Sequence, residues 1–462
     1  MIHTYSLNGR HFVLDVNSGA VHQADALFAR LCRALEPLAP QLPDACPPSV
    51  LEALGADYPA ADIAEAYGEA LELFHVEQLF SADGYDLFRE KMGLSPVKAM
   101  CLNVSHDCNL RCVYCFAGKG DYSQGRMVMS AETGKKAIDY LIGHSGDREF
   151  LEVDFFGGEP LLNFGVVKEV VAYARSLEGR HGKTFRFTIT TNGLLLDADM
   201  MEFINREMSN VVLSIDGRKQ VHDRVRARVD GSGCYDAVLP KFRQLVAGRG
   251  DKEYYVRGTF TRHNLDFAED VLAMRDAGFD QVSIEPVVAN PKEPWALTEE
   301  DLPAIGQEYE RLGELLYQSR KQGNFVNFFH FMLDLDQGPC AIKRLRGCGC
   351  GNEYLAVTPD GDVYPCHQFI GHEGWRMGSV HDGSLDLSLK ERFSRTTVYE
   401  KGDCRDCWAK FYCSGGCNAN NMIYQGDILK SHRFSCELEK KRLECAIALQ
   451  ARELEDAGTA RP

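Results

Sequence analysis

The feature that most constrains the fold is a repeated order of strand and helix between residues 99 and 288. Helical stretches such as SAETGKKAIDYLIGH and NFGVVKEVVAYARSL separate six segments that predict strands. Strict alternation of this kind predicts a parallel sheet with right-handed crossovers. Six units are too few for a closed eight-fold barrel, so we expect an α/β fold built on a partial (β/α)6 TIM-like barrel. The six predicted strands are Ala99–Ser105, Phe150–Phe156, Phe185–Thr191, Val211–Asp216, Tyr255–Thr261 and Gln281–Val288.

Four motifs fall at the carboxyl ends of these strands, where barrels of this kind carry their active sites. They are a cysteine triplet, Gly157-Gly158-Glu159-Pro160, Thr191-Asn192-Gly193 and Ser214-Ile215-Asp216-Gly217. Taken alone, GGEP also fits a tight glycine turn with a solvated glutamate, and the last two motifs also fit polar caps of strands. Their agreement in position predicts one site at this end of the barrel.

The triplet Cys108, Cys112 and Cys115 has the spacing C-x3-C-x2-C directly after the first strand. Iron–sulfur clusters are normally held by four cysteine thiolates, so three thiolates leave one iron of a [4Fe–4S] cluster open for another ligand. The alternative is a zinc site, which prefers four closed ligands in paired C-x2-C units. Ten further cysteines follow residue 300 and favour iron and sulfur.

Composition excludes several classes of protein. The net charge of −16 argues against general nucleic-acid binding. The chain has no apolar run of membrane-spanning length, and its start, MIHTYSLNGRHF, is not a signal peptide. Seventeen cysteines without an export signal indicate a reducing compartment and metal binding rather than disulfides. We therefore expect a cytoplasmic protein without nucleic-acid or membrane partners, from an anaerobic or low-oxygen organism.

The triplet, with Tyr114 before its last cysteine, resembles the signature of the radical S-adenosylmethionine (radical SAM) enzymes. The resemblance extends over residues 97–290 and implies that the open iron binds S-adenosylmethionine, which is cleaved to a 5′-deoxyadenosyl radical. It also implies cofactor contacts. The methionine ammonium would be received by Gly157, Gly158 and Glu159. The methionine and ribose would be contacted by Asn192, Ser214 and Asp216. Arg257 would face the carboxylate, and Tyr114 would pack on the adenine or fill space.

The C-terminal cysteines resemble a SPASM domain, which carries two auxiliary [4Fe–4S] clusters. The pattern is Cys348, twelve residues, Gly361-x4-Cys366, Cys404-x2-Cys407-x5-Cys413-x3-Cys417 and Cys436. A zinc ribbon explains at most four of these seven cysteines. The resemblance implies a distal cluster on Cys404, Cys407, Cys413 and Cys436, and a proximal cluster on Cys348, Cys366 and Cys417 with Cys340.

The fourth proximal ligand stays open at this point, because Cys350 also lies at a permitted spacing before Gly361, and a substrate cysteine is a third candidate. The remaining cysteines fit no ligand spacing. We expect Cys101, Cys234 and Cys445 to be buried thiols, Cys32 a core residue and Cys46 a loop residue.

The first 92 residues read as a separate small domain. HFVLDVNSGAVHQ alternates apolar and polar residues around Asn17-Ser18-Gly19, which predicts a hairpin. Helices are expected over ADALFARLCRAL and ADIAEAYGEALELFHVEQLF. The segment resembles the winged helix-turn-helix-like recognition element of peptide maturases, which pairs a leader peptide with a strand edge. The alternatives are a simple scaffold and a DNA-binding winged helix, and the abundant acidic residues argue against DNA.

We therefore expect five segments along the chain. They are a leader-peptide recognition element at 1–92, the radical SAM partial barrel at 97–300, bridging helices at 301–339, the SPASM domain at 340–437, and a C-terminal helix and tail at 438–462.

This order, with stretches such as LRGCGCGNEYLAVTPDGDVYPCHQF and CWAKFYCSGGCNANN, is similar to the maturases of SCIFF peptides ("six cysteines in forty-five residues"). The resemblance implies thioether bonds from cysteine sulfur to an acceptor carbon in a short Cys-rich precursor. It also implies S-adenosylmethionine, three [4Fe–4S] clusters, and a low-potential electron donor such as flavodoxin or ferredoxin. The rival hypotheses are another SPASM chemistry, such as formylglycine formation in sulfatases, and a non-enzymatic iron–sulfur electron carrier.

Overall fold

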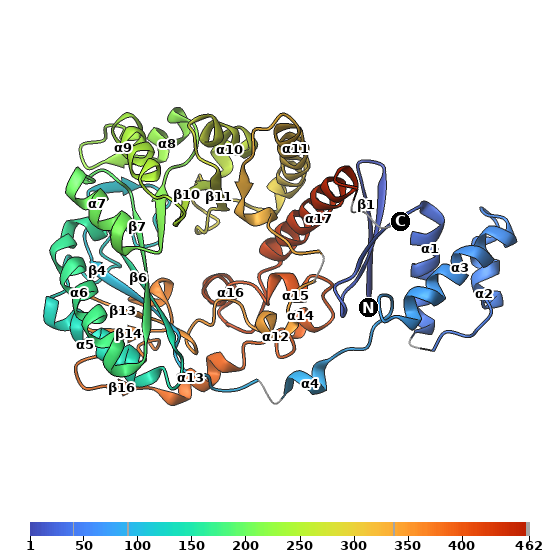
Figure 1. Ribbon diagram of the computed structural model, residues 1–462, viewed down its shortest axis with the longest axis horizontal. Helices are drawn as coiled ribbons and strands as arrows, with labels where there is room; N and C mark the ends of the chain where they lie inside the picture. The colour runs from blue at the N-terminus through green and yellow to red at the C-terminus, as the bar shows by residue number, and fades with distance from the viewer. Residues whose placement is uncertain (40, 90–91, 336–337, 459–462) are drawn as a thin grey trace.

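A computed structural model describes residues 1–39, 41–89, 92–335 and 338–458. Positions 336–337 of the expected bridging segment and 459–462 of the expected C-terminal tail therefore lie outside the described residues. The main body is built around an eleven-stranded sheet with helices along its outer side, and a small N-terminal domain lies at the other end of the molecule (Figure 1). None of the described helices is long and apolar enough to span a membrane.

The predicted order of strands and helices is confirmed. Six strands lie side by side in sequence order and pair in parallel throughout. The helices that follow them lie on the outer side of the sheet (Figure 1). The strands are β4 (Ala99–Ser105), β6 (Phe150–Gly157), β7 (Thr184–Thr191), β8 (Asn210–Ser214), β10 (Glu253–Phe260) and β11 (Gln281–Pro286). The helices are α5 (Ala131–His144), α6 (Phe164–His181), α7 (Ala198–Glu207), α8 (Lys219–Val225), α9 (Tyr235–Ala247), α10 (Phe267–Asp276) and α11 (Leu302–Lys321).

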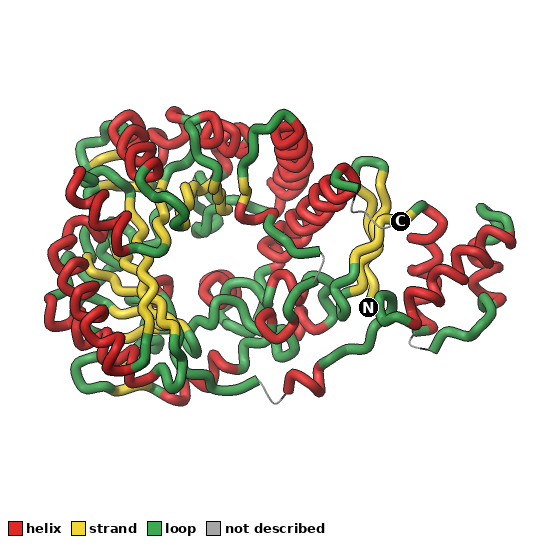
Figure 2. The backbone as a smooth tube through the Cα atoms, in the orientation of Figure 1, coloured by secondary structure: helices red, strands yellow, loops and turns green. Residues whose placement is uncertain are grey.

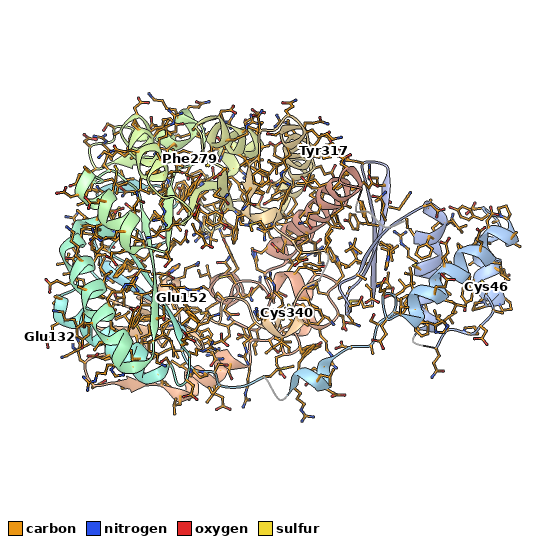
Figure 3. The ribbon with its side chains drawn as sticks, viewed as in Figure 1. Cys46, Glu132, Glu152, Phe279, Tyr317 and Cys340 are labelled. Atoms are coloured by element: carbon orange, nitrogen blue, oxygen red, sulfur yellow. The ribbon has the colours of Figure 1, made fainter. Side chains whose placement is uncertain are left out.

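Alternation of side chains along the strands separates the two faces of the sheet. In β6, Leu151, Val153 and Phe155 are fully buried in the main hydrophobic core, which also contains residues of α5 and α6. The residues between them are more exposed, and Figure 3 shows Glu152 on the inner side of the sheet, whereas Glu132 of α5 lies at the outer rim. The inner side therefore carries the polar groups.

The sheet continues beyond the six predicted strands. The short β12 (Asn327–Phe328) extends it in parallel beside β11, and β13 (Tyr354–Val357) extends it in parallel beside β4. Antiparallel β14 (Asp362–Tyr364), β15 (Gly378–Ser379) and β16 (Ser384–Leu385) follow. The sheet is thus mixed, and the Cys-rich segment shares it with the barrel strands. Local sequence pattern could not predict this, because the pairing joins segments about 250 residues apart.

The rest of the Cys-rich region consists of short helices on the inner side of the sheet (Figure 1). The long C-terminal helix then packs along α11. These elements are α12 (Ala341–Arg344), α13 (Leu387–Ser394), α14 (Gly402–Arg405), α15 (Lys410–Cys413), α16 (Asn418–Gln425) and α17 (Arg433–Asp456).

The N-terminal domain contains a three-stranded antiparallel sheet, and the predicted hairpin is its β2–β3 pair. It has its own core, formed mainly by the sheet and three helices. α17 lies between this domain and the main sheet (Figure 2). The elements are β1 (Ile2–Leu7), β2 (Arg10–Asp15), β3 (Val21–Ala24), α1 (Ala26–Leu35), α2 (Pro48–Leu54) and α3 (Ala60–His75), followed by α4 (Tyr85–Arg89) in the linker.

The glycine of the Thr191-Asn192-Gly193 motif is required by the fold. Gly193 has a φ of +75°, and a Cβ there would lie 2.0 Å from Cε1 of the buried Phe242. Gly193→Ala should therefore lower the free energy of unfolding by about 3 kcal/mol, from left-handed strain plus overpacking. Anaerobic urea denaturation measures this.

A matched control is available at the end of α6. Gly182 has a similar φ of +62°, but apart from its chain neighbours and the helix backbone, no atom of the described residues lies within 4 Å of the added Cβ. Gly182→Ala should therefore cost only about 1 kcal/mol, from backbone strain alone. Equal losses in the two variants would contradict the role assigned to Phe242.

Candidate active site

A cavity of 240 Å³ opens at the carboxyl ends of the barrel strands. The three triplet cysteines and every predicted cofactor contact except Asp216 line it. These predicted lining residues are Cys108, Cys112, Cys115, Tyr114, Gly157, Gly158, Glu159, Asn192, Ser214 and Arg257.

The cysteine loop is held by a two-stranded sheet. β5 (Leu110–Cys112) pairs antiparallel with β9 (Arg226–Arg228), which places Cys112 opposite Arg226. N–H groups point at two of the sulfurs. Sγ of Cys108 lies 3.4 Å from the main-chain N of Leu110 and 3.7 Å from Nδ2 of Asn192. Sγ of Cys112 lies 3.9 Å from Nη1 of Arg226. Donors of this kind tune iron–sulfur clusters.

The thiols themselves favour a metal. Burial raises the pKa of the Cys108 thiol to about 11 and that of the Cys112 thiol to about 12, and it also raises the pKa of Cys115. Without a metal these three groups are therefore neutral thiols at pH 7. Coordination deprotonates a thiol outright, so the donor set fits an iron–sulfur cluster.

The two glycines of the GGEP turn allow close backbone contact beside the cysteine loop. Gly157 has a φ of +135°, and an added Cβ would lie 2.3 Å from the carbonyl oxygen of Ser105. A Cβ on Gly158 would lie 2.2 Å from the carbonyl oxygen of Asp107. Side chains at these positions would push the cysteine loop away from the strand end.

Glu159 joins the ends of β6 and β7. Its fully buried carboxylate accepts hydrogen bonds from Oγ1 of Thr191 (2.7 Å) and from the main-chain N–H groups of Asn192 (2.9 Å) and Leu161 (3.0 Å). Burial raises its pKa to about 7, against these hydrogen bonds. A cation in the cavity would stabilise the charged form, so the site fits an ammonium group.

The carboxylate of Asp216 accepts hydrogen bonds from protein groups and does not point into the cavity. Its carboxylate accepts from the Tyr114 hydroxyl (2.6 Å), from Nε of Arg226 (3.0 Å) and from the main-chain N–H of Thr259 (2.9 Å). The Arg226 guanidinium also lies 5.5 Å from the centre of the Tyr114 ring. In this arrangement Asp216 and Tyr114 position Arg226 at the cavity wall.

Sequence reasoning missed Arg226. It lines the cavity, but it belongs to no motif and reaches the cysteine loop only through the pairing of β9 with β5. Its neighbour Cys234 is buried, as expected, beside Nε2 of His222 at 3.1 Å. Asp223, the third residue of this group, accepts hydrogen bonds from the main-chain N–H groups of Cys234 and Tyr235 at the start of α9.

Arg257, which the resemblance placed opposite the cofactor carboxylate, is half-exposed and paired with a protein carboxylate. Its Nη2 lies 3.6 Å from Oε1 of Glu285, and Nε2 of His330 lies 3.2 Å from the same oxygen. Burial alone would raise the pKa of Glu285, but His330 and Arg257 outweigh it and hold this pKa well below its usual range. Arg257 therefore enters the cavity as part of a charged pair.

The Cys-rich region contributes one side of the cavity. His367 and Gln368, directly after Cys366, line it together with the barrel residues. The His367 ring stacks on Phe156 with centroids 4.9 Å apart and lies 5.2 Å from Phe116. No sequence signal marked these residues as parts of the barrel site, because they follow a predicted ligand of another cluster.

The four predicted distal ligands meet in space. Cys404, Cys407, Cys413 and Cys436 line a second cavity, of 270 Å³, formed by α14, α15 and the first turn of α17.

A second group of four cysteines combines the three predicted proximal ligands with Cys350. Cys350 is buried and interacts with both Cys348 and Cys366, and Cys417 interacts electrostatically with the same two cysteines. A hydrogen bond with Cys350 lowers the pKa of Cys348 to about 6. Cys340 is exposed at the start of α12.

The predictions for the cysteines without ligand spacing are confirmed. Cys32, Cys101, Cys234 and Cys445 are buried. Cys46 is partly exposed in the loop before α2, far from the barrel in Figure 3.

Comparison with known proteins identifies both regions. The radical SAM superfamily matches residues 102–247, and the SPASM iron–sulfur cluster-binding domain matches residues 348–408. The cysteine-type anaerobic sulfatase-maturating enzyme of Clostridium novyi is 24% identical over 339 residues, which are 68% of this chain and 86% of that protein.

Two solved structures share the fold. Native anSMEcpe with bound AdoMet (S-adenosylmethionine) is 21% identical with a TM-score of 0.63, and the match covers 79% of this chain and all of that one. Streptococcus suis SuiB bound to S-adenosylmethionine is 16% identical with a TM-score of 0.54, and the match covers 94% of this chain and 98% of that one. SuiB has also been solved bound to precursor peptide SuiA. Residues 102–247 are thus similar to the radical SAM superfamily and residues 348–408 to the SPASM domain, on a fold shared with both solved structures.

Proposed function

We propose that the chain is a radical SAM enzyme that joins a cysteine sulfur of a ribosomally made, Cys-rich peptide to a carbon of an acceptor residue. The observation that carries this proposal is an unpaired strand edge in an N-terminal domain that packs against the SPASM region. Nε2 of His3 lies 3.0 Å from Glu444 of α17, and the His3 ring stacks on Trp408 with centroids 3.8 Å apart. Trp408 directly follows the distal ligand Cys407.

The strand edge belongs to β3. Within the described residues, β3 pairs only with β2. The main-chain N of Asp15 donates to the carbonyl oxygen of Ala20, and the alternation of the antiparallel ladder then turns the main-chain groups of Val21 and Gln23 away from β2. Outward-facing groups of this kind can pair with an extended leader peptide by strand addition.

The comparisons support peptide recognition by this domain. The match to SuiB leaves only 6% of the chain uncovered, so most of residues 1–92 must lie within this match. The match to anSMEcpe leaves 21% of the chain uncovered. The crystal structure of SuiB with precursor peptide SuiA supplies the analogy for the partner.

The barrel residues have distinct roles in this proposal. Cys108, Cys112 and Cys115 would hold the cluster, and Glu159 would receive the ammonium of S-adenosylmethionine. When bound, the cluster and S-adenosylmethionine supply a radical that removes hydrogen from the acceptor residue, and auxiliary clusters supply electron transfer. Arg226, fixed by Asp216 and Tyr114, and Arg257 would orient anionic groups. His367 and Gln368 would close the cavity toward the SPASM region and limit the access of water.

Formylglycine formation in a sulfatase is the second candidate, because the anaerobic sulfatase-maturating enzyme of Clostridium novyi aligns over 86% of its length. An iron–sulfur electron carrier is less consistent with the site, since a carrier needs no polar cavity beside an open iron. We further propose three [4Fe–4S] clusters and a low-potential electron donor such as flavodoxin or ferredoxin.

Anaerobic incubation with S-adenosylmethionine, a low-potential reductant and a Cys-rich peptide encoded beside this gene tests the proposal by mass spectrometry. We expect deoxyadenosine together with a peptide lighter by two hydrogen atoms for each crosslink. Cys112→Ala should abolish both products but keep the SPASM iron. An unmodified peptide, with a sulfatase peptide converted instead, would favour the second candidate.

The free edge of β3 gives a prediction for leader binding. Gln23→Pro removes one outward-facing N–H while the ladder with β2 stays intact, so leader affinity should fall about tenfold or more. Isothermal titration calorimetry with the full chain measures this. Gln23→Ala is the matched control, because it removes the side-chain bonds to Arg10 and Glu455 and keeps the N–H. Equal affinities of the two variants would rule out pairing at this edge.

The cysteine geometry gives a prediction for the proximal cluster. Because Cys350 lies buried in the group and Cys340 does not, Cys350→Ala should lose about one third of the bound iron and Cys340→Ala should lose none. Iron and sulfide analysis of anaerobically purified protein measures this. Loss of iron in Cys340→Ala alone would restore Cys340 as the fourth ligand. Full iron in both variants would point to an iron left open for the substrate thiol.

A further inference from the structure

A buried lysine lies between the two groups of SPASM cysteines. Lys401 is 1% exposed, and its Nζ donates to the carbonyl oxygen of Gly415 and to Oδ1 of Asn418, each at 2.7 Å. Across the residues that the structure describes, no carboxylate lies within ion-pair distance of this ammonium. The nearby Lys410 differs, because it is equally buried but pairs with Asp83 at 3.3 Å.

Chain connectivity fixes Lys401 between the two groups. Its carbonyl oxygen accepts from the main-chain N–H of the distal ligand Cys404 at 2.9 Å. Its hydrogen-bond partner Gly415 lies midway between the distal ligand Cys413 and the proximal ligand Cys417, and Asn418 directly follows Cys417. The ammonium therefore contacts the segment that connects one group to the other.

The electrostatic environment agrees with this position. Burial lowers the pKa of Lys401, and the charges that oppose this effect are those of Cys404 and Cys413 from the distal group and of Cys417 and Cys350 from the proximal group.

A buried ammonium without a carboxylate is costly unless other negative charge compensates it. Four thiolates around each [4Fe–4S] cluster provide net negative charge on both sides of Lys401. The reduction potential of such a cluster depends on nearby charge, hydrogen bonds and solvent exposure. A fixed positive charge stabilises the reduced, more negative form and so raises the potential.

We propose that Lys401 is a positioning residue that holds a positive charge between the two auxiliary clusters and raises the reduction potential of both. This inference rests on the cluster assignment of the proposed function and extends it to the control of electron flow. Raised potentials would make both clusters better acceptors for the electron that bond formation releases.

Redox titration of the holoprotein without peptide, followed by paramagnetic resonance, tests the proposal. Lys401→Gln keeps a donor toward Gly415 and removes the charge, whereas Lys401→Arg keeps the charge. We expect both auxiliary potentials to shift to more negative values in Lys401→Gln, to stay near wild type in Lys401→Arg, and the radical SAM cluster to be unaffected in both. Lys252→Gln is the matched control, because Lys252 also donates to two neutral oxygens, the main-chain carbonyls of Asn205 and Arg206, but directly precedes β10, at the opposite end of the barrel strands from the cavity.

Unchanged auxiliary potentials in Lys401→Gln would overturn the proposal. Loss of the auxiliary clusters from both Lys401→Gln and Lys401→Arg would also overturn it, in favour of a purely structural role. These outcomes are separate from the test of the proposed function: wild-type protein that fails to crosslink a peptide would leave the measured potentials, and the role of Lys401, unaffected.

Discussion

The pairing of β13 with β4 is the contact on which the arrangement of the site depends. Tyr354 to Val357 align in parallel with Ala99 to Leu102, and the main-chain N–H groups of Lys98 and Ala99 both donate to the carbonyl oxygen of Glu353. β4 leads into the cysteine triplet, whereas Cys350 and Cys366 lie on either side of β13 and β14. One ladder therefore fixes the distance between the barrel site and the proximal cysteines.

The charged groups around these cysteines either form ion pairs or hydrogen-bond to neutral groups. Asp216 and Arg226 satisfy one another at the cavity wall, and Glu285 is shared between Arg257 and His330. Among the described residues, Glu159 accepts hydrogen bonds from neutral donors and Lys401 donates to neutral acceptors. Unpaired charges of this kind are costly in a protein interior. Their opposite signs match a cationic ligand at the barrel site and anionic clusters in the SPASM region.

Sequence alone predicted the features that depend on local pattern. The alternation of strand and helix gave the six parallel strands, and the hairpin around Asn17-Ser18-Gly19 is present as β2 and β3. The spacing of the cysteines grouped the triplet and, separately, the four distal residues, and each group lines one cavity of its own. These patterns work because the ligands lie within short loops whose ends are fixed by neighbouring elements.

Features that depend on distant segments were missed. Arg226 reaches the cysteine loop through β9, and His367 reaches the barrel cavity because β13 joins the barrel sheet. Spacing permitted both Cys340 and Cys350, and only the burial of Cys350 beside Cys366 separates them. The pairing of Asp216 with Arg226 likewise shows that a polar residue at a strand end can support a site without facing it.

A few specific contacts dock the N-terminal domain against the Cys-rich region. His3 of β1 stacks on Trp408, and Asp83 of the linker accepts from the Tyr399 hydroxyl at 2.6 Å and pairs with Lys410. Both contacts involve the segment that carries Cys407 and Cys413, so the domain is held against the distal cysteine group rather than tethered by its linker alone. A peptide paired with β3 would then leave the domain from a fixed position relative to the barrel. Such preorganisation lowers the entropic cost of bringing the core peptide to the cavity.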